Sequence, residues 1–338
     1  MRPTRIRRQL VRAAKGSSGA ADVTPTLAQT DGVYVIGGQS LTCNPSVSNI
    51  GDTNFYSTIA KVWARRAPSS CPDMKDHAGM SIKAADEEIL VAGGVASFGP
   101  RREAKKYVPD FWQFRTSIPE PARGQSVGFG MNGVGFIVGG DDGDSTPAIN
   151  DVDKFFPSTN NWSAVGNALP EALGESAGFV LDGVGWYHGG QSNSSETTNR
   201  FFRFSGFGWQ NHPTPPSVAG NGQRGHAAFG VERDFQGYIV SGTWIAGVPN
   251  LTAEVHRWDT VAETWTTAGF IRSISGARVY LSAAAFDNRG FVHAGLNAGG
   301  FETSEHDEYN PITNAWTSHD DMPLPVRQRQ AAASLGDT

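Results

Sequence analysis

The chain has 338 residues, with 28 Lys and Arg against 33 Asp and Glu, and only 18% of its residues are charged. No stretch approaches the roughly 20 apolar residues that span a bilayer, so we expect no membrane insertion. Aromatic residues at 10% and 41 glycines favour a sheet protein with many tight turns over a helical or disordered one.

The N-terminal segment is basic. Its first sixteen residues hold six cations and no acid, namely Arg2, Arg5, Arg7, Arg8, Arg12 and Lys15. Since the whole chain has a net charge of -5, removing these cations leaves -11 for the remainder. Arg12 interrupts the short apolar run of residues 9–14, so we expect no Sec-dependent secretion.

We predict that residues 1–23 form an arm outside a folded domain of residues 24–338. As a helix, the arm would place Ile6, Leu10 and Val11 on one side with arginines around them. Its charge suits an acidic protein surface, and nucleic acid is the less favoured alternative. The residues that we expect to anchor the protein are Arg5, Arg7, Arg8 and Arg12.

Two series of residues recur in the rest of the chain at intervals of about 50 residues. The first consists of Trp63, Trp112, Trp162, Trp209, Trp265 and Trp316. The second consists of glycines that end a short apolar run: Gly38, Gly94, Gly140, Gly190, Gly242 and Gly295. Two independent series with one period indicate a repeat architecture, and a period of this length is typical of propeller blades.

Residues 122–165 show how one repeat folds. The alternating segment 122–130 and the apolar run 134–140 predict two strands, joined by the hairpin signal Asn132-Gly133. Residues 151–157 and 160–165 predict a third and a fourth strand across a polar turn. In five repeats an aromatic residue of the third strand precedes the tryptophan by seven positions, so we expect large aromatics to fill the wedge between neighbouring blades.

The repeats resemble the kelch motif, in which an apolar run enters Gly-Gly and is followed by an aromatic residue, a Trp and a Pro/Arg segment, here PEPARGQ and PLPVRQR. The resemblance covers roughly residues 27–336 and departs from the motif at Ser241-Gly242 and Ala294-Gly295. It implies an all-β fold, a six-bladed kelch-type β-propeller with four-stranded antiparallel blades. It also implies that a C-terminal strand, about residues 328–336, closes the first blade; the alternative donor is residues 24–29.

The long loops all fall on one end of such a ring, and binding sites are usually built on loops held by a rigid scaffold. Arginines recur where the chain enters the inner strands: Arg123, Arg224, Arg278 and Arg327, with Arg329 close behind. Resemblance to kelch domains that bind acidic peptides implies that they line the channel mouth and hold carboxylates. The alternative is that they pair with acids of neighbouring loops, which are Asp141, Asp142, Asp144 and Glu302.

A tryptophan and two cysteines complete the loop candidates. Trp244 is a candidate for stacking on a sugar or on a protein partner, unless it packs on its own blade. Cys43 and Cys71 fall in loops, where they are free thiols or form a local disulfide.

The sequence carries no recognisable catalytic motif. Some kelch-like propellers resemble copper radical oxidases, but Cys43 and Cys71 are both loop residues and the eight histidines form no pair at ligand spacing. Residues 302–308, ETSEHDE, could hold a cation or form a solvated strand edge. We therefore expect no catalytic residue, no metal and no cofactor.

These observations favour a non-enzymatic interaction or structural subunit of a larger assembly, cytoplasmic or virion-associated, such as a phage tail, neck or capsid-decorating protein. The expected partners are proteins of that assembly, and a carbohydrate or a receptor is the alternative ligand of the long-loop face. One alternative is a carbohydrate-active enzyme, a sugar epimerase or oxidase that uses Arg224, Glu302 or His306. The other is an intracellular adaptor that binds acidic peptides through the arginines.

Overall fold

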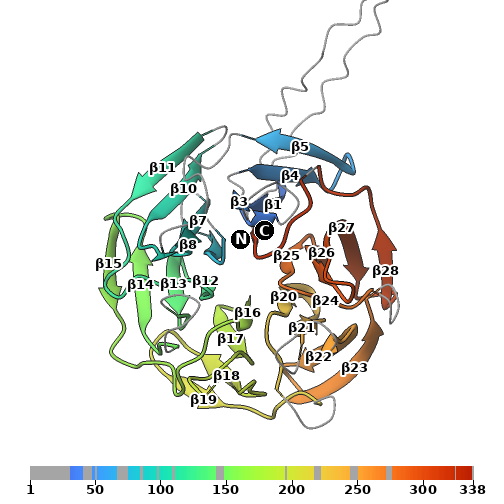
Figure 1. Cartoon of the computed structure of the whole chain (residues 1–338). Helices are drawn as coiled ribbons and strands as arrows, with labels where there is room; N and C mark the ends of the chain where they lie inside the picture. The colour runs from blue at the N-terminus through green and yellow to red at the C-terminus, as the bar shows by residue number, and fades with distance from the viewer. Residues whose placement is uncertain are drawn as a thin grey trace, which may run out of the picture.

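A computed structural model of the chain describes residues 31–40, 48–49, 52–66, 75–83, 87–96, 99–108, 111–141, 148–194, 196–216, 222–243, 250–271, 276–323 and 325–336. This part of the chain is a six-bladed β-propeller in which antiparallel sheets stand around a central axis (Figure 1). The predicted fold class is therefore confirmed. Within the described residues no helix is long and apolar enough to cross a membrane.

Each blade consists of four strands, and the first strand named for each blade is the one nearest the axis. Blade 1 contains β29 (Ala331–Leu335), β1 (Gly32–Ile36), β4 (Thr53–Ser57) and β5 (Val62–Arg66). Blade 2 contains β6 (Ala78–Ile82), β7 (Glu88–Ala92), β10 (Ala104–Val108) and β11 (Phe111–Arg115). Blade 3 contains β12 (Val127–Met131), β13 (Val134–Val138), β14 (Val152–Phe156) and β15 (Asn161–Ala164).

Blades 4 to 6 follow the same order. Blade 4 contains β16 (Ala177–Leu181), β17 (Val184–His188), β18 (Phe201–Phe204) and β19 (Trp209–Asn211). Blade 5 contains β20 (Ala227–Val231), β21 (Gln236–Val240), β22 (Glu254–Asp259) and β23 (Thr264–Phe270). Blade 6 contains β25 (Ser282–Phe286), β26 (Arg289–Asn297), β27 (Glu302–Asn310) and β28 (Ala315–Ser318). The remaining short elements are β2 (Gln39–Ser40), β3 (Ser48–Asn49), β8 (Val95–Ala96), β9 (Gly99–Pro100), β24 (Arg278–Val279) and the 3-10 turn η2 (Glu232–Asp234).

The C-terminal strand closes the ring. β29 is the innermost strand of blade 1 and pairs with β1 in a register that runs from Gly32 opposite Leu335 to Ile36 opposite Ala331. β29 also lies beside β25 of blade 6 and β6 of blade 2. The alternative donor, residues 24–29, lies outside the described residues. Pairing the two distant parts of the chain joins the first blade to the last without an open seam.

The fourth-strand tryptophans fasten neighbouring blades together. The indole N–H of Trp162 donates to the carbonyl oxygen of Thr116 at 2.7 Å, and that of Trp265 donates to Pro213 at 2.7 Å. Trp63 makes the same contact with Asp320 across the junction of blades 6 and 1, at 3.0 Å. Each acceptor belongs to the preceding blade in the ring. The predicted aromatic wedge is present, because the third-strand aromatic packs on the same indole at centroid distances of 5.0 to 5.3 Å in blades 1, 2, 3, 5 and 6.

The glycine that closes each apolar run bends the chain at the end of the second strand, or at a bulge within β26 in blade 6. Its φ lies between +100° and +113° in every blade, a region that strongly favours glycine. The first position is left-handed as well, and Ser241 and Ala294 adopt it with φ of 59° and 51°. Blades 5 and 6 therefore keep the turn although each has lost the first glycine.

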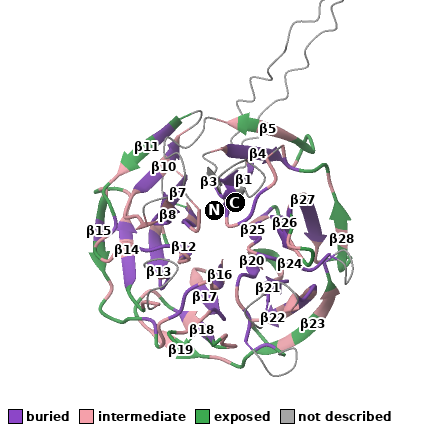
Figure 2. Ribbon diagram, in the orientation of Figure 1, coloured by how far each residue is buried: buried purple, intermediate pink, exposed green. Residues whose placement is uncertain are grey.

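Burial is greatest in the second strand of each blade (Figure 2). The second strands are buried along nearly their whole length, whereas most residues of the outer strands β5, β11, β15, β23 and β28 are exposed or half-buried. The inner strands approach one another so closely that small residues are required. A Cβ atom added to Gly130 of β12 would lie 1.5 Å from the carbonyl oxygen of Ser81, and one added to Gly230 of β20 would lie 2.4 Å from that of Val180.

We predict that Gly130→Ala destabilises the propeller by at least about 2 kcal/mol, because the new methyl group forces the backbones of blades 2 and 3 apart. The matched control is Gly166→Ala, since a Cβ there meets nothing within 4 Å. Urea unfolding should show a lower midpoint for the first variant and a midpoint close to that of the parent for the second. Equal midpoints for the two variants would contradict the close approach of the inner strands.

Candidate functional site

Six residues, one from each blade, form a closed ring of backbone hydrogen bonds around the axis. They are Asp76, Gln125, Glu175, Gly225, Tyr280 and Arg329, and we call them the axial ring. Each has a left-handed φ of 53° to 58°, and each donates its N–H to the carbonyl oxygen of a neighbour at 2.6 to 3.2 Å. The axial ring lies where the chain enters the inner strands, which is the end that carries the long loops.

Side chains of the axial ring, together with Arg224, form a compact charge cluster, which we call the axial cluster. Arg329 donates to both carboxylate oxygens of Asp76, at 3.2 and 3.1 Å, and its guanidinium lies 3.9 Å from the ring centroid of Tyr280. Glu175 lies between two cations, because Arg329 approaches one of its oxygens at 3.6 Å and Arg224 approaches the other at 2.8 Å. The two arginines are thus matched by two carboxylates.

Burial by itself lowers the pKa of the Arg329 guanidinium, but Asp76, with Tyr280 and Glu175, outweighs it and raises that pKa. Burial, assisted by Glu175, raises the pKa of the Tyr280 phenol. Arg329 therefore stays charged and Tyr280 stays protonated at neutral pH. The cavity that this cluster leaves has a volume of about 100 Å³. The side chains of the cluster therefore leave little free space between them.

Three of the predicted arginines lie inside the blades and do not line the channel mouth. Arg123, Arg278 and Arg327 have exposed fractions of 0%. Arg123 pairs with Asp153, and Arg278 pairs with Asp307 at 2.6 Å. The structure therefore corrects both predictions for these three arginines. They do not line the channel mouth, and the acids that they pair with are not the predicted loop acids.

The position of these arginines in the chain explains why their side chains enter the blades and do not line the channel. Each lies two residues before its axial-ring residue and reaches back into its own blade. Arg123 and Arg278 reach the third strand, and Arg327 donates to the carbonyl oxygen of Gly37 at 3.2 Å. Burial lowers the pKa of Arg123, against the opposing effect of Asp153. Burial likewise lowers the pKa of Arg327 to about 10.

The remaining predicted residues divide into two groups. Arg224 and Arg329 belong to the axial cluster, and Asp141 pairs through its backbone with Gly124 at 2.8 and 3.0 Å. The second group lies outside the described residues: Trp244, Asp142, Asp144, Cys43, Cys71 and the arm residues Arg5, Arg7, Arg8 and Arg12.

The residues of the enzyme alternative have separate surroundings. His306 is fully buried where blade 6 meets blade 1, with its Nδ1 atom 2.9 Å from that of His293 and its ring packed on Trp63. Burial, and then His293, lowers its pKa well below the usual value. Glu302 accepts a hydrogen bond from Gln328 at 3.4 Å. Within the described residues, no group of three or more His, Cys, Asp or Glu side chains could hold a metal ion.

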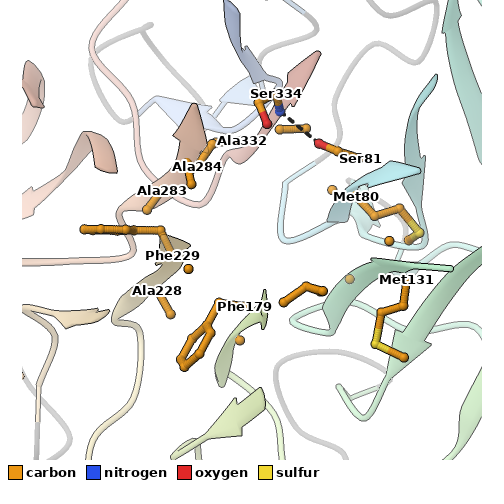
Figure 3. A pocket seen from close by; sticks show the side chains of 18 of the residues that line it. Met80, Ser81, Met131, Phe179, Ala228, Phe229, Ala283, Ala284, Ala332 and Ser334 are labelled. Atoms are coloured by element: carbon orange, nitrogen blue, oxygen red, sulfur yellow. Dashed lines mark hydrogen bonds between the residues drawn. The ribbon is translucent and has the colours of Figure 1, made fainter. Parts of the chain in front are cut away.

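A larger cavity occupies the axis beyond the axial ring and has a volume of about 420 Å³ (Figure 3). Small side chains such as Ala228 line it together with larger apolar ones such as Met131 and Phe179. Among the described residues that line it, only Lys83 and Glu232 are ionisable. The cavity therefore has few ionisable groups that could bind a ligand.

The end of the ring opposite the axial ring carries exposed apolar side chains. Here short hairpins join the first strand to the second and the third strand to the fourth, and we call this end the short-hairpin face. Five of the six outer hairpins carry a large apolar residue at or beside the tip: Ile59 (72% exposed), Phe111 (53%), Phe207 (81%), Val261 (82%) and Ile312 (66%). The repeat places these five residues at related positions around the rim.

No family model matches the sequence, and no curated protein is detectably similar to it. Among solved structures the fold recurs: one described as the structure of YjhT superposes with a TM-score of 0.64, over 79% of this chain and 89% of that chain. The two sequences are 15% identical in the superposition, so the similarity shows the fold alone.

Sequence analysis did not find the axial ring. Its members are spaced by about 50 residues, as the tryptophans are, but they share no side-chain chemistry. Their common property is a left-handed backbone two residues before each inner strand. Only the period, counted back from the predicted first strands, could have located Asp76, Glu175 and Tyr280.

The buried histidines give a pH dependence. Burial lowers the pKa of His77 and His256 to about 4 and that of His188 and His293 to about 3. The unfolded chain takes up protons on these imidazoles below about pH 6.5, whereas the folded chain does not. The free energy of unfolding is therefore at its full value above about pH 7. It falls as the pH drops from about 6.5 to about 4, by about 1.4 kcal/mol per pH unit for each extra proton that the unfolded chain binds.

Urea unfolding at several pH values should show this loss. The His77→Leu variant should lose stability less steeply, because one of the titrating groups is gone. A free energy of unfolding that stays constant from pH 7 to pH 5 would contradict the buried, neutral histidines.

Proposed function

We propose that this protein is a non-enzymatic interaction or structural subunit of a larger assembly. The observation that carries the proposal is the set of five exposed apolar side chains around the short-hairpin face. Full burial of one such side chain contributes about 1.5 to 3 kcal/mol. A partner that covered several of them would gain the apolar anchors that dominate protein interfaces.

The axial cluster supports a non-catalytic role. Asp76 and Glu175 hold both Arg224 and Arg329 within 4 Å, so these guanidiniums are already engaged. Ligand pockets commonly have volumes of about 300 to 1,000 Å³, and the cavity at the cluster has only about 100 Å³. We infer that the charges fix the geometry of the ring. Charge reversal at the fully buried Arg327 would therefore test folding before it tested capture of acidic peptides.

The basic arm is the proposed anchor. The arm carries six cations, whereas the remainder of the chain has a net charge of -11. A neighbouring subunit with an acidic surface would attract these cations. We propose a virion as the setting, with the protein as a phage tail, neck or capsid-decorating component, and we propose that its repeats are kelch repeats. Support for the repeats comes from the Gly-Gly turns and the indole contacts between blades.

The test removes the apolar tips and leaves the fold alone. The combined variant should have a free energy of unfolding within about 1 kcal/mol of that of the parent, because exposed positions contribute little. Its substitutions are Ile59→Thr, Phe111→Ser, Phe207→Ser, Val261→Thr and Ile312→Thr. It should fail to enter the assembly that the parent enters as a stoichiometric component, measured by purification of intact particles or complexes.

The control is the polar outer hairpin of blade 3, where Ser158→Ala and Thr159→Ala should assemble like the parent. Normal assembly of the combined variant would overturn the role of the short-hairpin face. Absence of the parent chain from every isolated particle or complex would overturn the proposed function.

A further inference from the structure

A second pocket lies between blades 4 and 5 at the short-hairpin face and has a volume of about 380 Å³. Blade 4 contributes a row of side chains across its strands, in which Trp186 is paired opposite Arg203 and Arg203 opposite Gln210. Blade 5 contributes Phe235 and Thr260. The volume falls in the range of small-molecule sites, unlike that of the axial cluster.

The pocket lies beside an aromatic contact that recurs from one blade to the next. Phe204 packs on Phe136 of the preceding blade at a centroid distance of 5.2 Å. Trp258 occupies the corresponding position of blade 5 and packs on Trp186 at 5.5 Å. The pocket opens next to the latter contact, and Thr260 is one of the residues that line it.

The floor and one edge of the pocket are aromatic. Trp186 is 96% buried at the floor, and its indole N–H has no hydrogen-bond partner in the described part of the chain. Phe235 is 44% exposed at the edge. His212 lies edge-on to Trp186 at a centroid distance of 5.0 Å. Burial lowers the pKa of His212, against the effect of Glu263, so its ring is neutral and offers one donor and one acceptor.

Polar groups surround this aromatic surface. The amide oxygen of Gln210 accepts a hydrogen bond from Arg203 at 3.0 Å, which fixes the orientation of the amide. The carboxylates of Asp182 and Glu263 line the same pocket. Two carboxylates against one guanidinium disfavour an anion, and the ring of donors and acceptors disfavours a purely apolar ligand.

We propose that this pocket binds an uncharged sugar ring. A pyranose has an apolar C–H face that suits the exposed ring of Phe235. Its edge carries hydroxyl groups that both donate and accept, as the amide, imidazole and carboxylate groups require. The pocket shares Val261 with the proposed assembly surface, but binding of a sugar does not require the assembly.

The experiment is a titration of the full chain with glucose, galactose and N-acetylglucosamine, followed by the indole N–H resonances in ¹⁵N NMR spectra. Binding should shift the resonance of Trp186 and leave that of Trp162 unchanged. Thr260→Phe places an aromatic ring in the pocket, and it should reduce the apparent affinity at least about tenfold without lowering the unfolding midpoint. Gln210→Ala should weaken binding roughly 2- to 12-fold, as the loss of one net hydrogen bond does.

The matched control is Ser163→Ala, the position of blade 3 that corresponds to Gln210, and it should bind sugar like the parent. The proposal is overturned if none of the three sugars shifts the Trp186 resonance, or if Thr260→Phe binds as the parent does. It is also overturned if p-cresol shifts the resonance and no sugar does, because the pocket would then be an anchor site for an aromatic side chain of a protein partner.

Discussion

The ring depends on the indole that each blade places against the blade before it. The tryptophan packs on the third-strand aromatic of its own sheet, and in four blades its N–H reaches a carbonyl group of the neighbour, as Trp162 does with Thr116. The N–H of Trp112 reaches the hydroxyl group of Thr53 instead, and that of Trp316 has no partner among the described residues. A buried tryptophan contributes both a large apolar surface and a donor that needs a partner, so it fixes distance and orientation together. Because Trp63 repeats the contact with Asp320 across the closing junction, blades 1 and 6 are joined as blades 2 and 3 are.

The packing at the axis determines where chemistry can take place. Small residues bring the inner strands together, and the axial ring ties them with one hydrogen bond per blade. The arginines near the axis then serve the scaffold: Arg123 and Arg278 brace their own third strands, and Arg329 joins Asp76 to Glu175. Charges already engaged in this way are poorly placed to bind a ligand. Among the described residues, the hairpin tips and the pocket between blades 4 and 5 remain as candidate surfaces for function.

The repeat made much of this fold predictable. A period of about 50 residues gives the number of blades, and hairpin signals such as Asn132-Gly133 give the strand order, because both depend on local spacing. The direction of the arginines was not predictable in this way. Arg327 and Arg329 are two residues apart, yet the first enters its blade and the second joins the axial cluster, since a left-handed backbone at Arg329 redirects the chain. The inter-blade pocket was also hidden, because its lining comes from strands and hairpins of two blades that only the folded ring brings together.

Removal of the closing strand tests the interlocked ring most directly. A chain that ends at residue 326 keeps all six fourth-strand tryptophans but lacks β29, so β1 loses its inner partner and the contacts of β29 with β25 and β6 are lost. The closed ring predicts that this chain loses its single cooperative unfolding transition, and that a separate peptide of residues 325–338 restores the transition on binding. A truncated chain that unfolds in one transition at the midpoint of the parent would contradict the closed ring.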